Sequence, residues 1–124
     1  MGDWAIAYRC ESTHGSVIVI GEFQLTLPDW ALKELTQLPT QLPDVTDRMR
    51  EVIRFARLNI ERETGGPFAA GVFEAESGRL VTIGVNRVVP SQCSSAHAEV
   101  MALSLAQKAI GGFDLGVEGQ PAYQ

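Results

Sequence analysis

Apolar and polar residues alternate with a helical period in the middle of the chain. The pattern predicts an amphipathic helix capped by Thr46 or Asp47 and ended by the glycines and proline of residues 65–67. Arginines and glutamates stand mostly between the apolar positions, which places the arginines on a solvated face. The predicted apolar positions of this helix are Met49, Val52, Ile53, Ala56 and Ile60.

Two apolar segments follow this helix and predict an antiparallel β-hairpin. Residues 68–75 and 80–86 have the composition of strands, and residues 76–79 form the turn between them. Gly78 supplies the positive φ angle that a tight turn requires. The hairpin is the only pair of adjacent strands that the pattern predicts.

A second helix is predicted over residues 96–110, after a polar loop that contains Pro90. Ser94 or Ser95 would cap this helix, and the glycines at 111 and 112 would end it. Residues 122–124 are a candidate start of a third strand. The order helix, strand, strand, helix indicates an α/β domain.

The N-terminal part of the chain has a different character. Residues 16–20 are rich in β-branched residues and predict a strand, and residues 28–38 predict a short helix begun by proline. Residues 38–44 contain two prolines and predict a linker. We therefore divide the chain into an extension, 1–45, of unknown role, and a main domain, 46–124. The extension would cover a face of the main domain or a dimer interface.

Composition narrows the class of protein. The chain has 124 residues, of which 45% are hydrophobic and 20% charged, which is typical of one soluble domain. Its net charge is −5 without a cluster of Lys and Arg, so a nucleic-acid partner is disfavoured and a small substrate fits better. The sequence lacks an apolar stretch of about 20 residues, which argues against a membrane span. Together with Cys10 and Cys93, which predict free thiols, this favours the cytoplasm.

The residues with the clearest chemical meaning open the second predicted helix. His97 is a candidate metal ligand through its neutral imidazole, and Glu99 is a candidate to take a proton from a metal-bound water. The spacing alone is weak evidence, since residues two apart on a regular helix point to nearly opposite sides.

Two further segments of the chain, taken together with the segment around His97, strengthen this interpretation. Residues 65–72 read Gly-Gly-Pro-Phe-Ala-Ala-Gly-Val, residues 84–88 read Gly-Val-Asn-Arg-Val, and residues 96–102 contain the first half of the His-x-Glu and Pro-Cys-x-x-Cys signature of zinc deaminases. In this order the three runs resemble the cytidine and deoxycytidylate deaminase superfamily. Gly-Gly-Pro-Phe looks most like the guanine deaminase branch. The resemblance covers about residues 46–112.

The resemblance implies a cytidine deaminase-like α/β/α sandwich with a mixed sheet, and a zinc-dependent enzyme of purine metabolism. His97 matches the zinc ligand and Glu99 the proton shuttle, while Asn86 matches the residue that reads the ring edge and Phe68 one that walls the ring pocket. Guanine is the first substrate we expect, giving xanthine and ammonia, with aminated triazines as related rings. A homodimer is also implied.

The sequence departs from the family in one respect. Since no cysteine follows Cys93, a four-coordinate zinc would lack two of its three protein ligands. We expect these as cysteines beyond residue 124, which makes the chain part of a longer protein. A tRNA adenosine deaminase and a non-catalytic deaminase-fold protein stay open as alternatives. The purely structural alternatives are that Asn86 closes a turn and that Phe68 belongs to the hydrophobic core.

The open edge of the hairpin leads to the first prediction. Unpaired strand edges invite association between chains, so the isolated 124-residue chain should be aggregation-prone or partly molten. Near-UV circular dichroism and thermal melting test this. Sharp aromatic bands together with a cooperative melt would contradict it.

Overall fold

The computed structural model describes residues 19–116 and residue 123. The predictions for residues 16–18, 122 and 124 therefore fall outside the described residues. Val19 and Ile20, at the end of the strand predicted over residues 16–20, are exposed and have no strand structure. In chain order, the described elements are α1 (Asp29–Gln37), α2 (Val45–Glu61), β1 (Ala69–Phe73), β2 (Leu80–Val85), α3 (Val88–Ser91) and α4 (Ala98–Ile110).

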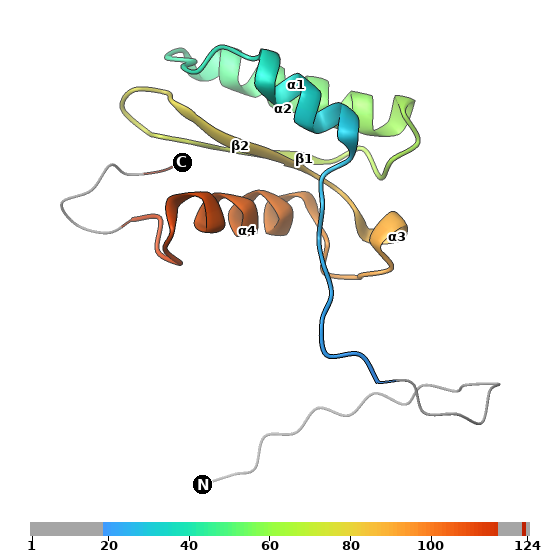
Figure 1. Ribbon diagram of the computed structural model, residues 1–124. Coiled ribbons are helices and arrows are strands. Elements are labelled where there is room, and N and C mark those ends of the chain that lie inside the picture. Colours follow the sequence, from blue (N-terminus) through green and yellow to red (C-terminus); the bar gives the residue numbers. More distant parts are fainter. Residues whose placement is uncertain (1–18, 117–122, 124) are drawn as a thin grey trace, which may run out of the picture.

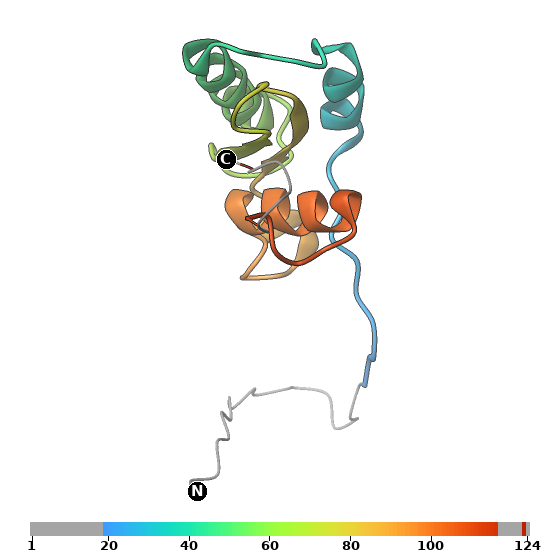
Figure 2. The same cartoon turned by 90° about the vertical axis from the view of Figure 1, so that its left-hand side faces the viewer.

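The helices cover both faces of the strand pair. In Figure 1, α1 and α2 lie on one side of β1 and β2, and α4 lies on the other side. The view turned by 90° in Figure 2 shows the same layers from another side, with α1 beside α2 rather than over the strands. Layers of helix, sheet and helix confirm the predicted α/β class.

The predicted hairpin is present and slightly shorter than expected. β1 pairs antiparallel with β2 from Ala69 opposite Val85 to Phe73 opposite Leu80. Gly78 has a φ angle of +72° in the turn, as predicted. Among the described residues the sheet contains these two antiparallel strands, so the mixed sheet stays a prediction.

One apolar core joins the N-terminal segment to the layers. The Trp30 and Phe55 rings lie with their centroids 5.5 Å apart, which packs α1 on α2. Residues 25–38 therefore cover a face of the main domain, as expected for part of the extension. The buried members of this core are Leu27, Trp30, Ala31, Phe55, Ile83, Val85, Ala96 and Met101.

The predicted apolar face of α2 is mostly wrong, although Val52 packs against the core. Met49, Ile53 and Ile60 are each about half exposed, whereas Phe55 and Asn59 are completely buried. Apolar side chains occur on both sides of this helix, and the large Phe55 ring, packed against Trp30, decides which side faces the core.

Arg48 also departs from the predicted solvated face. Its side chain is 5% exposed on the inner side of α2. Nε donates to the Leu42 carbonyl at 2.6 Å, and Nη2 donates to the Pro43 carbonyl at 3.1 Å. The guanidinium also lies over the Phe73 ring, 5.7 Å from its centroid. A buried cation is tolerated here because carbonyls and an aromatic face replace water.

The predicted helix caps need correction. Asp44 caps α2, since its carboxylate accepts from the Thr46 backbone N–H at 2.8 Å, so neither Thr46 nor Asp47 is the cap. For α4 the N-cap position is His97, two residues after Ser95 and three after Ser94, the predicted caps. The polar loop before α4 contains the short helix α3, which begins after Arg87.

The predicted linker is bonded to the hairpin turn. The Leu42 N–H donates to the Gly78 carbonyl and the Leu80 N–H donates to the Thr40 carbonyl, each at 2.9 Å. The prolines of residues 38–44 do not prevent these two bonds, because neither bond uses a proline nitrogen. Near the other end of the chain, Tyr123 forms an isolated antiparallel bridge with Glu74.

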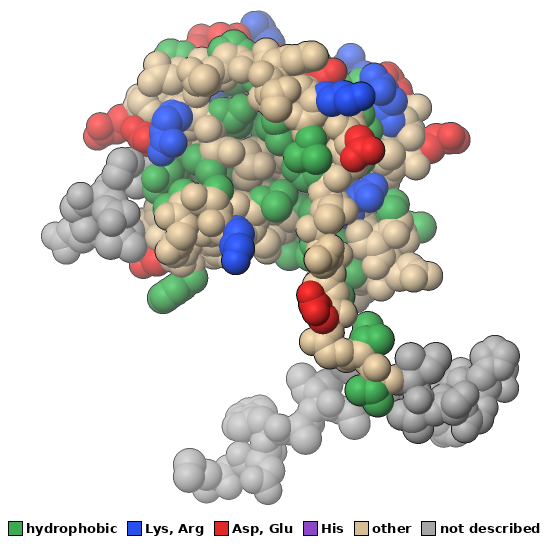
Figure 3. All heavy atoms as spheres, viewed as in Figure 1, with side chains coloured by type: hydrophobic (Ala, Val, Ile, Leu, Met, Phe, Trp, Pro, Cys, Tyr) green, Lys and Arg blue, Asp and Glu red, His purple; other side chains and the backbone are tan. Residues whose placement is uncertain are grey.

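Charges of both signs are mixed on the surface. On the face in Figure 3, acidic and basic side chains stand close to one another around α1 and α2, with apolar side chains between them. Among the residues that the structure covers, none of the helices has the length and apolar character needed to cross a bilayer.

The contact between β2 and α4 is very close at Gly84. A Cβ atom added there would lie 2.7 Å from the Ala98 carbonyl oxygen and 2.9 Å from the Ala102 Cα, closer than real Cβ atoms approach. Gly84 therefore lets the first turns of α4 rest directly on the sheet.

This contact predicts that Gly84→Ala lowers the free energy of unfolding of the full-length gene product by about 1 to 3 kcal/mol, because the methyl group forces α4 away from β2. Urea denaturation followed by circular dichroism measures the change. Gly112→Ala is the control, since a Cβ there meets nothing within 4 Å. Equal stability of the two variants would contradict the prediction.

Candidate active site

Two of the predicted site residues meet at the end of the hairpin where β1 begins and β2 ends. Phe68 precedes β1 and Asn86 follows β2. The Asn86 backbone N–H donates to the Phe68 carbonyl at 3.1 Å, which extends the hairpin pairing by one residue. The sequence places them 18 positions apart, and the hairpin brings them together.

The Asn86 side chain has a defined orientation. Its Oδ1 accepts from the Gly66 N–H at 3.4 Å and from the Val88 N–H at 3.3 Å. A carbonyl oxygen offers two lone pairs, so both backbone donors together occupy that end of the amide. The amide nitrogen is then the end that can donate to a ligand. The bond from the Val88 N–H is the local turn contact expected if Asn86 has a purely structural role. This contact uses only the side-chain oxygen and leaves the amide nitrogen available.

Phe68 lies at the rim of this end of the molecule. Its side chain is 61% exposed, so the interpretation of Phe68 as ordinary core is wrong for the described structure. A Cβ added to Gly66 would lie 3.5 Å from the Phe68 ring and 3.5 Å from Asn86 Oδ1, which shows how near these groups are. An exposed ring beside an oriented amide can contact the face of a flat ligand.

His97 is tied to the same region through its neighbour. The Arg87 N–H donates to the Ala96 carbonyl at 2.9 Å, which joins the segment after β2 to the start of α4. His97 is exposed and has extended backbone angles, φ −69° and ψ 157°, at the N-cap position. Side chains two residues apart on a regular helix point to nearly opposite sides. His97 precedes the regular helix, so this rule does not strictly apply to His97 and Glu99.

Glu99 lies in the first turn of α4 and is exposed. A carboxylate in this turn is stabilised by the positive end of the helix dipole. The side chain lines a groove of about 370 Å³ along β1, together with Gly71 and Leu103. Glu99 is thus exposed at a groove beside β1.

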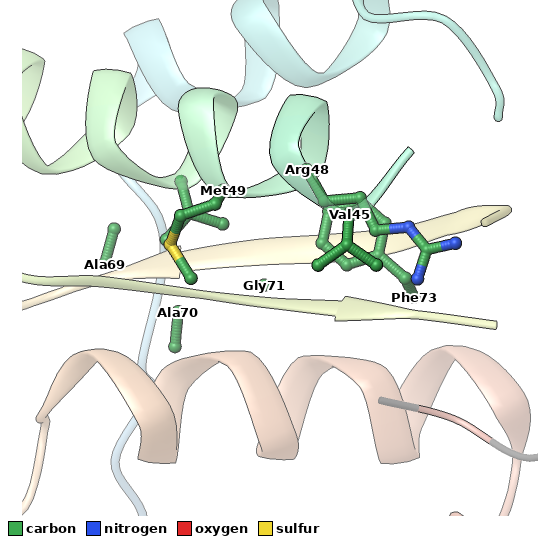
Figure 4. A pocket seen from close by; sticks show the side chains of 8 residues that line it. Val45, Arg48, Met49, Ala69, Ala70, Gly71 and Phe73 are labelled. Carbon is green, nitrogen blue, oxygen red and sulfur yellow. The ribbon is translucent and has the colours of Figure 1, made fainter. Parts of the chain in front are cut away.

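A second groove lies on the opposite side of β1. It measures about 290 Å³ and is lined by residues of α2 and β1. Figure 4 shows Val45 and Met49 reaching down from α2 toward β1, with Ala69 pointing to α2 and Ala70 pointing to α4. This groove contains none of the four predicted site residues, so the groove at Glu99 is the better candidate for ligand contact.

The described residues do not form a complete metal site. Within residues 19–116 and 123, no group of three or more His, Cys, Asp and Glu side chains is placed to hold a metal ion. His97 is the one predicted ligand in this range. Cys93 Sγ lies 3.2 Å from Ser95 Oγ, and this hydrogen bond holds the pKa of the Cys93 thiol below its ordinary value.

Sequence reasoning missed two polar residues that support this end of the hairpin. Asn59 is completely buried on α2, and its Nδ2 donates to the Gly66 carbonyl at 2.8 Å. Arg87 donates from Nη1 to the Thr64 carbonyl at 2.7 Å, and burial lowers the pKa of its guanidinium. Asn59 stands four residues after Phe55, on the same side of the helix. A polar residue one turn beyond a core aromatic residue was therefore the signal in the sequence that could have identified Asn59.

Comparisons with known proteins identify solved structures of similar fold. A guanine deaminase from Nitrosomonas europaea is 41% identical, with a TM-score of 0.76, over 86% of this chain and 58% of that chain. A protein solved in complex with 2,6-diaminopurine is 45% identical, with a TM-score of 0.74, over 81% of this chain and 52% of that chain. A guanine deaminase from Bacillus subtilis is 29% identical, with a TM-score of 0.55, over 58% of this chain and 45% of that chain.

These likenesses confirm the predicted fold class, an α/β fold of the cytidine deaminase type. The chain spans about half the length of the solved structures that it matches, between 45% and 58%. No protein-family model and no curated protein matches it.

The hydrogen bond to Ser95 predicts the reactivity of Cys93. Since the thiolate is the reactive form and the bond lowers the pKa of the thiol, alkylation by iodoacetamide should reach half its maximal rate below the pH of about 8.5 expected for a free cysteine. Ser95→Ala should move this midpoint to higher pH, and Ser94→Ala should not. Mass spectrometry of the peptide that contains Cys93 measures the rate; equal midpoints in both variants would speak against the bond.

Proposed function

We propose that this chain is part of a zinc-dependent guanine deaminase that hydrolyses guanine to xanthine and ammonia. The observation that carries the proposal is the 41% identity to a guanine deaminase over 86% of this chain, with Asn86 and Phe68 in contact at the end of the hairpin. A relative solved in complex with 2,6-diaminopurine supports an aminated purine as the class of substrate.

In this reaction, Asn86 and Phe68 would bind the ring and Glu99 would transfer protons. The Asn86 amide nitrogen is oriented to donate to an acceptor on the ring edge, because its oxygen is held by two backbone N–H groups. The exposed Phe68 ring can pack on the flat ring. Glu99 takes one proton from the attacking water and gives it to the ring nitrogen. It then takes the proton of the hydroxyl group added to the ring carbon and gives it to the amine, which leaves as ammonia, so Glu99 acts as a base and as an acid in turn.

Zinc is the cofactor that the His97-x-Glu99 pattern implies. His97 is exposed at the start of α4, and a single nitrogen donor does not hold zinc tightly. The described residues therefore do not fit a complete zinc site, and the proposal requires two further donors, which we expect to be cysteines beyond residue 124.

We further propose a cytoplasmic homodimer that acts on a small ring in purine metabolism. The net charge of −5 and the mixed charges in Figure 3 disfavour a nucleic-acid substrate and hence a tRNA adenosine deaminase. The other alternative is a deaminase-fold protein without catalysis, which the zinc content of the full-length gene product distinguishes from the proposal.

Zinc content and ammonia release separate these candidates. We expect the full-length gene product to bind about one zinc per chain and to release ammonia from guanine. His97→Ala should lose most of the zinc. His14→Ala, at the other histidine of the chain, is the control and should keep it.

Glu99→Gln should keep the zinc and lower kcat at least about 100-fold, because general acid–base catalysis contributes factors of that size. Elemental analysis and an ammonia assay make both measurements. A well-folded parent without zinc and without ammonia release would overturn the proposal in favour of the non-catalytic alternative. Release from a tRNA but not from guanine would favour the tRNA adenosine deaminase.

A further inference from the structure

The buried amide of Asn59 joins the two segments that hold the Asn86 side chain. Its Nδ2 donates to the Gly66 carbonyl at 2.8 Å and to the Asn86 carbonyl at 2.9 Å. Its Oδ1 accepts from the Thr64 hydroxyl at 2.8 Å. Both protons of the amide nitrogen and one lone pair of the oxygen are therefore used, which explains why a polar side chain is tolerated with 0% exposure.

The network continues outward to α1. The Thr64 hydroxyl that donates to Asn59 accepts from Trp30 Nε1 at 2.8 Å. A chain of hydrogen bonds thus runs from Trp30 through Thr64 to Asn59 and ends on the two backbone carbonyls. Each member restrains the next, so the orientation of the Asn59 amide is determined from both sides.

These two carbonyls belong to the residues that position the Asn86 amide. Gly66 donates its N–H to Asn86 Oδ1, and Asn86 carries that side chain. The donors to Asn86 Oδ1 stand at 3.3 and 3.4 Å, near the long end of hydrogen-bond geometry, so a small shift of Gly66 would release the amide. The Asn59 amide nitrogen joins the carbonyls of Gly66 and Asn86 and so holds these two residues together, next to the weak bonds to Asn86 Oδ1. We call this arrangement the clamp.

The loop leaves little space for another arrangement. A Cβ added to Gly65 would lie 2.6 Å from Asn59 Nδ2, closer than real Cβ atoms approach, and would collide with the Asn86 carbonyl oxygen. The absence of a side chain at Gly65 is what allows the loop to close on the buried amide. The sequence Gly65-Gly66 is therefore part of the clamp.

We propose that Asn59 is a positioning residue for the recognition of the substrate ring, acting through the backbone of Gly66 on the side-chain amide of Asn86. This inference rests on the proposed function for its effect on guanine. Its structural part, the control of the Asn86 amide by Asn59, does not depend on that function.

The test compares Asn59→Asp with Thr64→Val in the full-length gene product. Asn59→Asp keeps the shape of the side chain but replaces the donating nitrogen with an oxygen that faces two carbonyls. Thr64→Val removes both the bond from Trp30 and the bond to Asn59 Oδ1, and leaves both donors of Asn59 in place, so it reports the cost of disturbing the network alone. Asn59→Ser, which is too short to reach both carbonyls, is a second variant should Asn59→Asp fail to fold.

We expect Asn59→Asp and Asn59→Ser to lower kcat/KM for guanine at least about tenfold, mainly through KM, and Thr64→Val to change it by less than about threefold, because one lost ligand hydrogen bond is worth roughly a factor of ten or more. In an Asn86→Ala background the Asn59 substitutions should have little further effect, since neighbours that act on one another are not additive. A full tenfold loss in that background, or equal losses for Asn59 and Thr64 variants, would overturn the proposal.

A second measurement separates this inference from the proposed function. In ¹H–¹⁵N spectra, the Asn59 substitutions should shift the side-chain NH₂ signals of Asn86 and speed the exchange of the Gly66 amide proton, while Thr64→Val leaves both near their parent values. If the parent shows no activity on guanine but these changes occur, the function is wrong and the clamp stands. If the Asn86 signals do not respond, the clamp is wrong, whether or not the protein deaminates guanine.

Discussion

The close approach of α4 to the hairpin is the constraint on which the candidate site depends. Gly84 leaves space for the backbone of α4, and the small buried side chains of Ala98 and Ala102 do the same from the helix side. His97 directly precedes Ala98, and Glu99 directly follows it. The distance between α4 and β2 therefore determines where His97 and Glu99 lie relative to Asn86. The small residues that allow this close packing in the core are for that reason also required for the geometry of the site.

The loop before β1 is held mainly by side chains. The Gly66 carbonyl accepts one backbone bond, from the Phe68 N–H at 2.9 Å, and the remaining partners of the Thr64 and Gly66 carbonyls are side chains. Arg87 and Asn59, which lie far apart in the chain, supply those partners from two directions. This arrangement fixes the loop without lengthening β1, and it leaves Phe68 at the rim with its ring exposed.

Features that depend on local sequence could be predicted, and features that depend on packing could not. The hairpin and its turn at Gly78 follow from strand composition and glycine geometry, and Asn86 and Phe68 meet because they stand at the same end of that hairpin. Most of the apolar face of α2 was predicted wrongly because apolar residues occur on both sides of the helix, and only the contact of Phe55 with Trp30 selects one. Arg48 is bonded to carbonyls of the segment just before α2, and Asn59 to carbonyls of the loop before β1 and the residue after β2, which no periodic pattern records.

The position of His97 also bears on the ligands that a zinc ion would require. His97 and Glu99 stand at the N-terminus of α4, where the helix dipole carries a partial positive charge. A divalent cation placed there adds positive charge to a positive field, so neutral ligands alone would leave the charge uncompensated. The cysteine thiolates that we propose as the remaining donors would carry negative charge of the kind that offsets both.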